Sequence, residues 1–297
     1  MKYTYYPGCS LHSTSWEYDA STRAVFRRLG IELEELDDWS CCGATSAHAT
    51  DDFLGKALPL RNLILAEEKG QDIMLPCAAC YNTLRTADRF MRSGSQQARE
   101  LNLELARVMG REYQGTVETR HILDVLQDKT VQSLLKSRVV RPLTGLKVAA
   151  YYGCLLNRPP EIVSFDVPEQ PVVMDRLLET IGAEPVQWSY KTECCGGSSS
   201  IPQPEVAVRL NTRIVLDALR SGAQAIVTAC PLCHVNLDTR QEGAIGQVPE
   251  LGAGMPIFHI TELLGIALGT PEEEVRQWFA RHLVDPGRLF SESTQVA

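Results

Sequence analysis

Short apolar runs that end at a turn recur along the chain. Residues 72–76 and 225–229 are two such runs, and each leads directly into a loop followed by helix-forming sequence. A run of this length, bounded by turn residues, is typical of a buried β-strand. Residues 31–36 instead alternate apolar and acidic side chains, which is the period of two expected for a half-buried strand. The hydrophobic pattern therefore predicts several short strands, each closed by a loop.

Helical periodicity fills the segments between these strands. A first strand over residues 3–7 is followed by a predicted helix over 15–29, with Ser15 as its N-cap. Further helices are predicted over about 52–69 and from about residue 82 onward. Strands and helices that alternate in this way indicate a small α/β domain with a mainly parallel sheet.

The second half of the chain repeats the first. Residues 147–151 form the next predicted strand, and residues 206–218 carry the next amphipathic helix. The sequence His-Ile-Leu-Asp-Val-Leu at 121–126 is similar to His-Ile-Thr-Glu-Leu-Leu at 259–264. The pattern predicts two tandem duplicated, Rossmann-like α/β domains related by a pseudo-twofold axis. We place the boundary near residues 140–145, which gives domains 1–142 and 143–297.

His121 and His259 each stand at the start of a predicted helix. A histidine in this position is most often a capping or core residue, and we favour that interpretation over ligation of a metal cluster. The tail begins with a further amphipathic helix, in which Thr270 is the expected cap and Pro271 the first helical residue. The residues expected to pack inward from it are Val275, Trp278, Phe279 and His282.

Composition narrows the class of protein. The chain has 297 residues, 44% of them hydrophobic, 22% charged, and a net charge of −8. This negative charge argues against non-specific binding of nucleic acid. No apolar run approaches the roughly 18 residues that span a bilayer, and no apolar segment typical of a signal peptide follows Met1. We therefore expect no membrane insertion and a cytoplasmic location. In the cytoplasm cysteines remain reduced, and they bind metals or take part in redox chemistry.

The ten cysteines form one pattern that occurs twice. Each half has a single cysteine after a glycine, a Cys-Cys-Gly pair and a CxxC motif. The interval from single cysteine to pair is 32 residues in the first half and 40 in the second, and the interval from pair to CxxC is 35 in both. The two sets are Cys9, Cys41, Cys42, Cys77 and Cys80, and Cys154, Cys194, Cys195, Cys230 and Cys233.

Three uses of cysteine fit this pattern poorly. Adjacent Cα atoms lie about 3.8 Å apart, below the usual disulfide range of about 4.4–6.8 Å, so a bridge within either pair would be strained. A structural zinc ion takes four ligands and would leave the fifth cysteine of each half without a role. A thioredoxin-like dithiol needs only the CxxC. Zinc and dithiol chemistry stay open as weaker alternatives.

An iron–sulfur cluster is the use that fits best. Thiolates alone can ligate such a cluster, although an ordinary cubane needs only four, so a fifth thiolate implies an unusual cluster. Loops at the carboxyl ends of parallel strands converge on one crevice, where α/β folds build sites. The adjacent glycines allow the backbone to approach a compact inorganic core. These glycines are Gly8, Gly43, Gly153, Gly196 and Gly197.

The spacing of the cysteines resembles that of the CCG-domain proteins. Two copies without a fused ferredoxin-like segment are similar to the B subunit of heterodisulfide reductase. The resemblance spans nearly the whole chain and extends to three short phrases, at residues 6–9, 38–43 and 152–160. It is specific, because five cysteines coincide twice.

The resemblance implies one non-cubane [4Fe-4S] cluster in each half, held by the five cysteines of that half. The two clusters would face one another across the domain interface and cleave a disulfide such as the coenzyme M–coenzyme B heterodisulfide. Electrons would come from the ferredoxin-like C subunit of such a reductase, supplied by its flavin-containing A subunit. The alternative is an electron-transfer component of a larger flavin-based complex, with no disulfide substrate of its own.

An anionic disulfide requires basic residues near the clusters. Arg158 lies close to a cysteine loop, and Lys191 is a second candidate for substrate binding. Both also fit an ordinary surface position. The proline-rich segment 155–171 has no counterpart in the first half, so it is expected either to wall the crevice between the clusters or to serve as an exposed spacer.

Overall fold

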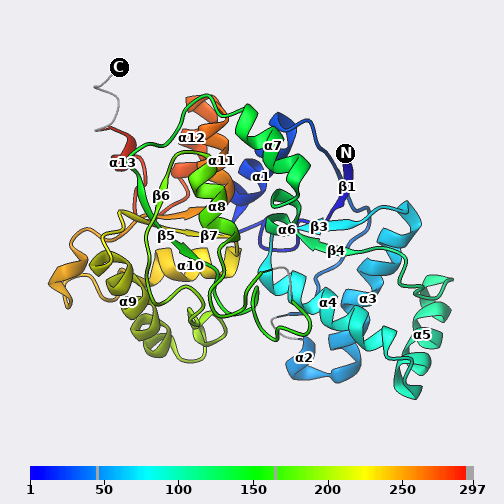
Figure 1. Ribbon diagram of the computed structural model, residues 1–297. Coiled ribbons are helices and arrows are strands. Elements are labelled where there is room, and N and C mark those ends of the chain that lie inside the picture. Colours follow the sequence, from blue (N-terminus) through cyan, green and yellow to red (C-terminus); the bar gives the residue numbers. More distant parts are fainter. Residues whose placement is uncertain (45–46, 164–165, 292–297) are drawn as a thin grey trace.

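Two parallel four-stranded sheets organise the molecule, one in each half of the chain (Figure 1). The computed structural model describes residues 1–44, 47–163 and 166–291. The strand orders are β2-β1-β3-β4 and β6-β5-β7-β8, and all paired strands run parallel. The strands are β1 (Lys2–Tyr5), β2 (Glu32–Glu35), β3 (Ile73–Leu75), β4 (Thr119–His121), β5 (Lys147–Tyr151), β6 (Glu184–Pro185), β7 (Ala225–Thr228) and β8 (Ile257–His259).

Helices cover both sheets. Those of the first half are α1 (Trp16–Arg28), α2 (Ala47–Thr50), α3 (Asp52–Lys69), α4 (Ala78–Arg92), α5 (Gln96–Met109), α6 (Ile122–Leu126) and α7 (Lys129–Ser137). Those of the second half are α8 (Val173–Thr180), α9 (Pro204–Arg220), α10 (Pro231–Arg240), α11 (Ile260–Ala267), α12 (Glu272–Phe279) and α13 (Arg288–Ser291). Two 3₁₀ turns, Gly197–Ser199 and Pro249–Leu251, lie in the loops of the second half.

The prediction of two tandem α/β units is confirmed. Both halves have the same strand order, and α1 of the first half packs on α11 of the second while α8 of the second packs on α6 of the first. This exchange of helices is what a pseudo-twofold relation requires. The predicted boundary at residue 142 falls between α7 and β5.

Several boundaries differ from those predicted. Strand β1 ends at Tyr5, because Pro7 lacks the N–H that would extend it. Helix α4 begins at Ala78, inside the CxxC motif and one turn before the predicted start. Ser15 occupies the N-cap of α1 without a side-chain cap bond.

The tail helix and the fourth strands also depart from the prediction. Pro271 stands at the N-cap of α12, and the Thr270 hydroxyl has no hydrogen-bond partner among the described residues, so the predicted cap is wrong. Trp278 and His282 are buried as expected. Strands β4 and β8 were not predicted, because a segment of three residues is too short to show a period.

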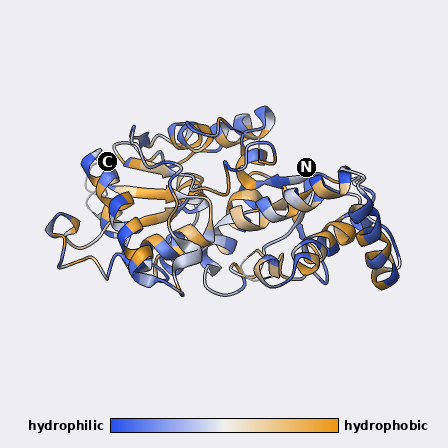
Figure 2. Cartoon of the chain, turned by 90° about the horizontal axis from the view of Figure 1, so that it is seen from below, coloured by the Kyte–Doolittle hydropathy of each residue, from blue (hydrophilic) through white to orange (hydrophobic). Residues whose placement is uncertain are grey.

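The burial of the strands follows from their sequence. All four residues of β7 are buried, whereas β2 is a half-exposed edge strand whose Glu32 and Glu34 pair with lysines. Glu34 lies 2.7 Å from Lys2 and 2.8 Å from Lys69. Figure 2 shows the hydrophobic strands of the second sheet lying between helices that turn hydrophilic residues outward. The sheets thus supply the rigid base on which the cysteine loops sit.

Candidate metal centre

Every cysteine lies in a loop or helix start just beyond the carboxyl end of a strand. In the first half Cys9 follows β1, the Cys41–Cys42 pair follows β2, and the CxxC follows β3. The strand order reverses between β1 and β3, and this switch point is where open α/β sheets bind their ligands. The second half repeats the arrangement after β5, β6 and β7. The expectation that the strands precede the cysteines is met in both halves.

Equivalent hydrogen bonds hold the two Cys-Cys-Gly loops. The Tyr6 hydroxyl donates to the carbonyl oxygen of Ser40 at 2.8 Å, and the Tyr151 hydroxyl donates to that of Glu193 at 2.6 Å. Ser40 and Glu193 each precede a cysteine pair. A tyrosine at the end of the first strand of each half therefore positions the pair that follows the neighbouring strand.

The five thiols of the first half are close together. The Sγ atoms of Cys9 and Cys41 are 3.9 Å apart, and those of Cys42 and Cys80 are 3.2 Å apart. The backbone N–H of Gly43 donates to Cys41 Sγ at 3.4 Å. Contacts with Cys42 and Cys9 lower the pKa of Cys41 to about 2. One sulfur of this set is thereby stabilised as a thiolate, the form that binds metals.

The second half builds a matching set. Cys195 Sγ lies 3.6 Å from Cys233 Sγ, and the Gly196 N–H donates to Cys194 Sγ at 3.3 Å. A hydrogen bond from Cys154 lowers the pKa of Cys194 to about 6. All ten cysteines are free thiols, which leaves no disulfide in either half.

The two sets meet across the domain interface. The thiols of Cys77 and Cys230, the first cysteines of the two CxxC motifs, interact directly and are both buried. Each is also the N-cap residue of its helix, α4 or α10. Tyr18 lies beside them: its hydroxyl donates to the carbonyl oxygen of Pro76 at 3.1 Å. Burial, and then the charge of Cys230 and Cys77, raises the pKa of Tyr18 well above its usual value.

Each set has a closed end and an open end. The two CxxC motifs and the second cysteine of each pair are buried, whereas Cys9, Cys41 and Cys194 are exposed. A group held by either set would thus be shielded where the halves meet and accessible at the opposite end.

Glycines keep the space around the sulfurs clear. A Cβ atom on Gly153 would lie 3.0 Å from Cys233 Sγ, and one on Gly8 would lie 3.2 Å from Cys80 Sγ. Both glycines have a positive φ, +66° and +73°, which other residues adopt at a cost. A compact core with five thiolate donors and close-lying backbone fits an iron–sulfur cluster, which takes all-thiolate ligation.

The favoured interpretation of the two helix-leading histidines agrees with the structure. His121 Nδ1 accepts from the Leu123 N–H at 3.2 Å, and its Nε2 lies 2.9 Å from the carbonyl oxygen of Pro76. His259 is fully buried, with its ring stacked between those of Tyr18 and His234 at centroid distances of 3.9 and 4.0 Å.

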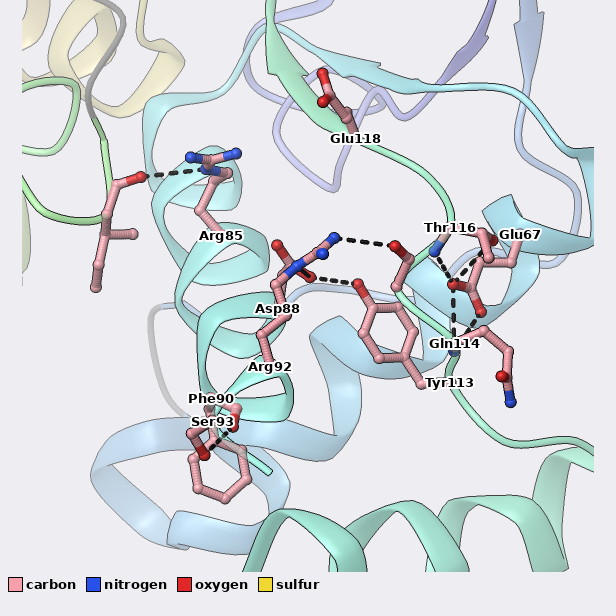
Figure 3. A network of polar contacts seen from close by, with 12 residues as sticks. Glu67, Arg85, Asp88, Phe90, Arg92, Ser93, Tyr113, Gln114, Thr116 and Glu118 are labelled. Carbon is pink, nitrogen blue, oxygen red and sulfur yellow. Dashed lines mark hydrogen bonds and ion pairs between the residues drawn. The ribbon is translucent and has the colours of Figure 1, made fainter. Parts of the chain in front are cut away.

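The loop at residues 155–171, which was a candidate to wall the crevice, contacts helix α4 of the first half. Asn82 of α4 donates to the carbonyl oxygens of Leu155 at 3.1 Å and Arg158 at 2.8 Å. Farther along α4, the Arg85 side chain donates to the carbonyl oxygen of Ile162, a contact that Figure 3 shows as a dashed line at Arg85. Arg89 donates to the carbonyl oxygen of Glu161. The loop bridges the halves through backbone contacts of residues 155–162, while side chains such as Arg158 and Glu169 are exposed; its residues 164–165 lie outside the described part of the chain.

The two basic candidates lie in different surroundings. Arg158 is half-exposed, with its guanidinium 3.1 Å from Glu169. Lys191 is only 3% exposed, and its ammonium lies 2.6 Å from Asp175 Oδ1 and 3.3 Å from the Pro171 carbonyl oxygen. This ion pair occupies Lys191 inside the second half, so we assign it a structural role there and keep Arg158 as the candidate for substrate.

A cavity of about 310 Å³ opens beside the first cysteine set. Ala44 follows the Cys-Cys-Gly loop, Ala79 lies within the CxxC, and Leu155 follows Cys154 of the other half. The remaining lining residues are His48, Gly55, Lys56, Asn82, Thr83, Thr86, Ala87 and Phe90. Sequence reasoning did not find this cavity or the roles of Asn82 and Tyr18, because each depends on contact between the halves.

No helix in the described part of the chain is long and apolar enough to cross a membrane.

Comparison with known proteins identifies related chains. The model of a cysteine-rich domain family named CCG matches residues 3–85 and 148–238. The membrane anchor subunit of an 8-methylmenaquinol:fumarate reductase, from Wolinella succinogenes, is 33% identical over 92% of this chain and 94% of its own. The B subunit of a ferredoxin/F420H2-dependent CoB-CoM heterodisulfide reductase, from Methanosarcina acetivorans, is 32% identical over 92% of this chain and 91% of its own.

A solved structure shares the fold at low sequence identity. A hypothetical protein from Helicobacter pylori superposes with a TM-score of 0.72 and 9% identity, over 96% of this chain and 52% of that one. The likeness extends over both halves of the present chain.

Proposed function

This chain belongs to the family of cysteine-rich CCG-domain proteins that includes the B subunit of heterodisulfide reductase, and we propose that it is the iron–sulfur protein that cleaves a disulfide in a complex of that type. Each half would hold one non-cubane [4Fe-4S] cluster through its five cysteines. The complex would work in the cytoplasm, where a reducing environment keeps these thiols available.

The contact between Cys77 and Cys230 is the observation that carries the proposal. It brings two five-thiol sets, each complete within its own half, to a common interface. Cleavage of a disulfide takes two electrons and two protons and yields two thiols, so a pair of adjacent one-electron centres suits the reaction. A single cluster remote from the other would have to act twice on the same bond.

The chain's own residues would bind and orient the substrate. The 310 Å³ cavity between the first cysteine set and Leu155 lies at the lower end of ligand-pocket volumes, which suits one arm of a disulfide. Arg158 lies near the Cys154 loop and would attract an anionic group. The contacts between α4 and the 155–162 segment keep the two halves in one relative position, on which productive geometry depends.

Electrons would enter from partner proteins. We propose the ferredoxin-like C subunit of a heterodisulfide reductase complex as the immediate donor, with the flavin-containing A subunit behind it. The open ends of the cysteine sets, at Cys9, Cys41 and Cys194, offer the exposed edges that such a transfer needs.

A second candidate function is electron transfer without a disulfide substrate. The relative from Wolinella succinogenes is named for a quinol:fumarate reductase, and its identity to this chain equals that of the heterodisulfide reductase relative within one percentage point. The same cysteine sets would then pass electrons between a quinol-oxidising and a fumarate-reducing part of a complex.

Turnover of the purified complex distinguishes the two functions. Anaerobic complex, reduced through its flavin, is mixed with the coenzyme M–coenzyme B heterodisulfide and, separately, with fumarate. Release of free thiols with reoxidation of the clusters supports disulfide cleavage, and Arg158→Ala should weaken it while leaving iron content intact. Cluster reoxidation by fumarate alone, with no thiol released from the disulfide, would favour the second function.

A further inference from the structure

A buried group of one carboxylate and two imidazoles lies next to the second cysteine set. Glu17 comes from α1 of the first half, His234 directly follows Cys233 in α10, and His259 ends β8. Their exposed fractions are 2%, 3% and 0%. One candidate ligand atom from each lies within 4.8 Å of the other two. None of the three takes part in the function proposed above.

The polar atoms of Glu17 and His259 have few partners. Glu17 Oε1 and His259 Nε2 face one another at 3.4 Å, which is longer than a typical hydrogen bond. Within the described residues Glu17 Oε2, His259 Nδ1 and His259 Nε2 make no hydrogen bond. A buried polar atom without a partner costs about 1–3 kcal/mol. A cation bound between these side chains would give the buried oxygen and nitrogen atoms the partners that they lack.

His234 is oriented as a ligand. Its Nε2 lies 2.9 Å from the carbonyl oxygen of Ile257. A carbonyl oxygen only accepts, so Nε2 carries the hydrogen. In the neutral ring with its hydrogen on Nε2, Nδ1 carries the lone pair that a metal ion would bind. Histidines that bind metals commonly donate their other ring N–H to a backbone carbonyl in this way.

We propose that Glu17, His234 and His259 bind one divalent transition-metal ion that links the two halves of the chain. Two imidazoles and a carboxylate suit zinc or ferrous iron. The 3.4 Å between Glu17 Oε1 and His259 Nε2 matches the edge of a tetrahedron with metal–ligand bonds of about 2.0–2.1 Å. The rings of His234 and His259 are stacked with 18° between their planes, so ion binding turns them until both lone pairs converge.

The neighbouring His282 and Glu262 form a different kind of contact. His282 Nε2 lies 2.9 Å from Glu262 Oε1, a hydrogen-bond distance that is too short for a tetrahedral edge. The other Glu262 oxygen accepts the backbone N–H of His259 at 2.8 Å. This pair therefore orients the end of β8 and thus positions His259.

The repeat provides an internal control. In the first half Tyr81 follows the CxxC where the second half has His234, and His121 corresponds to His259. Both His121 nitrogens already have partners in Pro76 and Leu123. The proposed site is thus a property of the second half together with α1.

The test uses the intact chain with zinc as the probe ion. Anaerobically purified protein is crystallised with zinc supplied, and anomalous diffraction is measured at the zinc and iron edges. We expect one peak among Glu17, His234 and His259, an angle between the two imidazole planes well above 18°, and about one metal ion per chain beyond those bound by cysteine. In Glu17→Gln and in His259→Asn this ion should be lost at unchanged cysteine-bound metal, whereas His121→Asn should retain it.

Either of two results would overturn the proposal: wild-type crystals without a peak at this position, or a peak that survives in Glu17→Gln. Thermal unfolding midpoints check that the variants fold, and Glu17→Gln preserves the side-chain shape. The result is independent of the cluster assignment, because the position of the peak separates this ion from any metal at the cysteines.

Discussion

The Lys191 ammonium lies 2.6 Å from the Asp175 carboxylate in the interior of the second half, and both side chains are less than 10% exposed. The second carboxylate oxygen accepts the Tyr152 hydroxyl at 2.7 Å. The backbone carbonyl of Lys191 also accepts the N–H groups of Tyr152 and Gly153, just before Cys154. This ion pair connects helix α8 to two of the three cysteine loops of its half.

Replacing Lys191 with Met should therefore destabilise the protein. The variant leaves Asp175 charged and buried without its cation, a change that costs about 3–5 kcal/mol. Urea unfolding measures the loss, and the exposed Lys129→Met serves as the matched control. The double variant Lys191→Met/Asp175→Asn should recover most of the stability, because it removes the buried charge. A Lys191→Met variant as stable as Lys129→Met would show that the pair contributes nothing.

Gly153 should be essential for the second metal centre alone. An added Cβ would lie 3.0 Å from Cys233 Sγ, so Gly153→Ala should displace that sulfur and reduce the iron content by about half. Gly145→Ala is the control, since Gly145 has a similar φ of +82° but nothing within 4 Å of the added atom. Equal iron contents in the two variants would mean that the close approach at Gly153 has no effect on the metal.

Asn82→Ala should loosen the contact between the halves. It removes two hydrogen bonds to the 155–158 segment, together worth about 1–3 kcal/mol. We expect faster proteolytic cleavage in this segment and unchanged cleavage elsewhere. The exposed Gln97→Ala, outside any such contact, should behave as wild type. Cleavage in Asn82→Ala at the wild-type rate would show that these two hydrogen bonds do not hold the loop against α4.

Stability should fall in mild acid partly through His121. Burial lowers its pKa to about 4, against about 6.5 in the unfolded chain. The unfolded state binds more protons between these values, so the stabilising contribution is complete above pH 6.5 and is lost as the pH falls toward 4. At pH 5 the loss from this residue is about 2 kcal/mol.

The matching variant is His121→Asn, because asparagine can still cap α6. The change in urea midpoint between pH 7 and pH 5 should be smaller in this variant than in wild type. Some dependence should remain, since burial lowers the pKa of His234 as well. An identical change in both proteins would show that His121 is not the titrating group.

The repeat and the cysteine loops could be predicted from the sequence because their signals are local. An apolar run before a CxxC, such as residues 72–76, can be recognised from a few consecutive residues, and the same pattern occurs again in the second half. The positions of the ten thiols at strand ends follow from that pattern. Strands β4 and β8 escaped detection because three residues define no period.

The contacts between the halves could not be predicted in this way. Cys77 and Cys230 occupy equivalent positions in the two repeats, but this equivalence does not predict that they are in contact. A sequence repeat does not reveal which surfaces of the two domains pack against each other. Glu17 and His234 are likewise brought together only by the packing of α1 on the second half. Lys191 was expected near substrate because nothing in the sequence marks Asp175 as its buried partner.

The central claim is that the two five-cysteine sets each hold an iron–sulfur cluster. Iron, acid-labile sulfide and zinc per chain, measured on anaerobically purified protein, test it most directly. The account predicts about eight iron atoms with an equal amount of sulfide, and about half of each in Cys9→Ser or Cys194→Ser. Cysteine-bound zinc in stoichiometric amount with iron and sulfide near zero would contradict it.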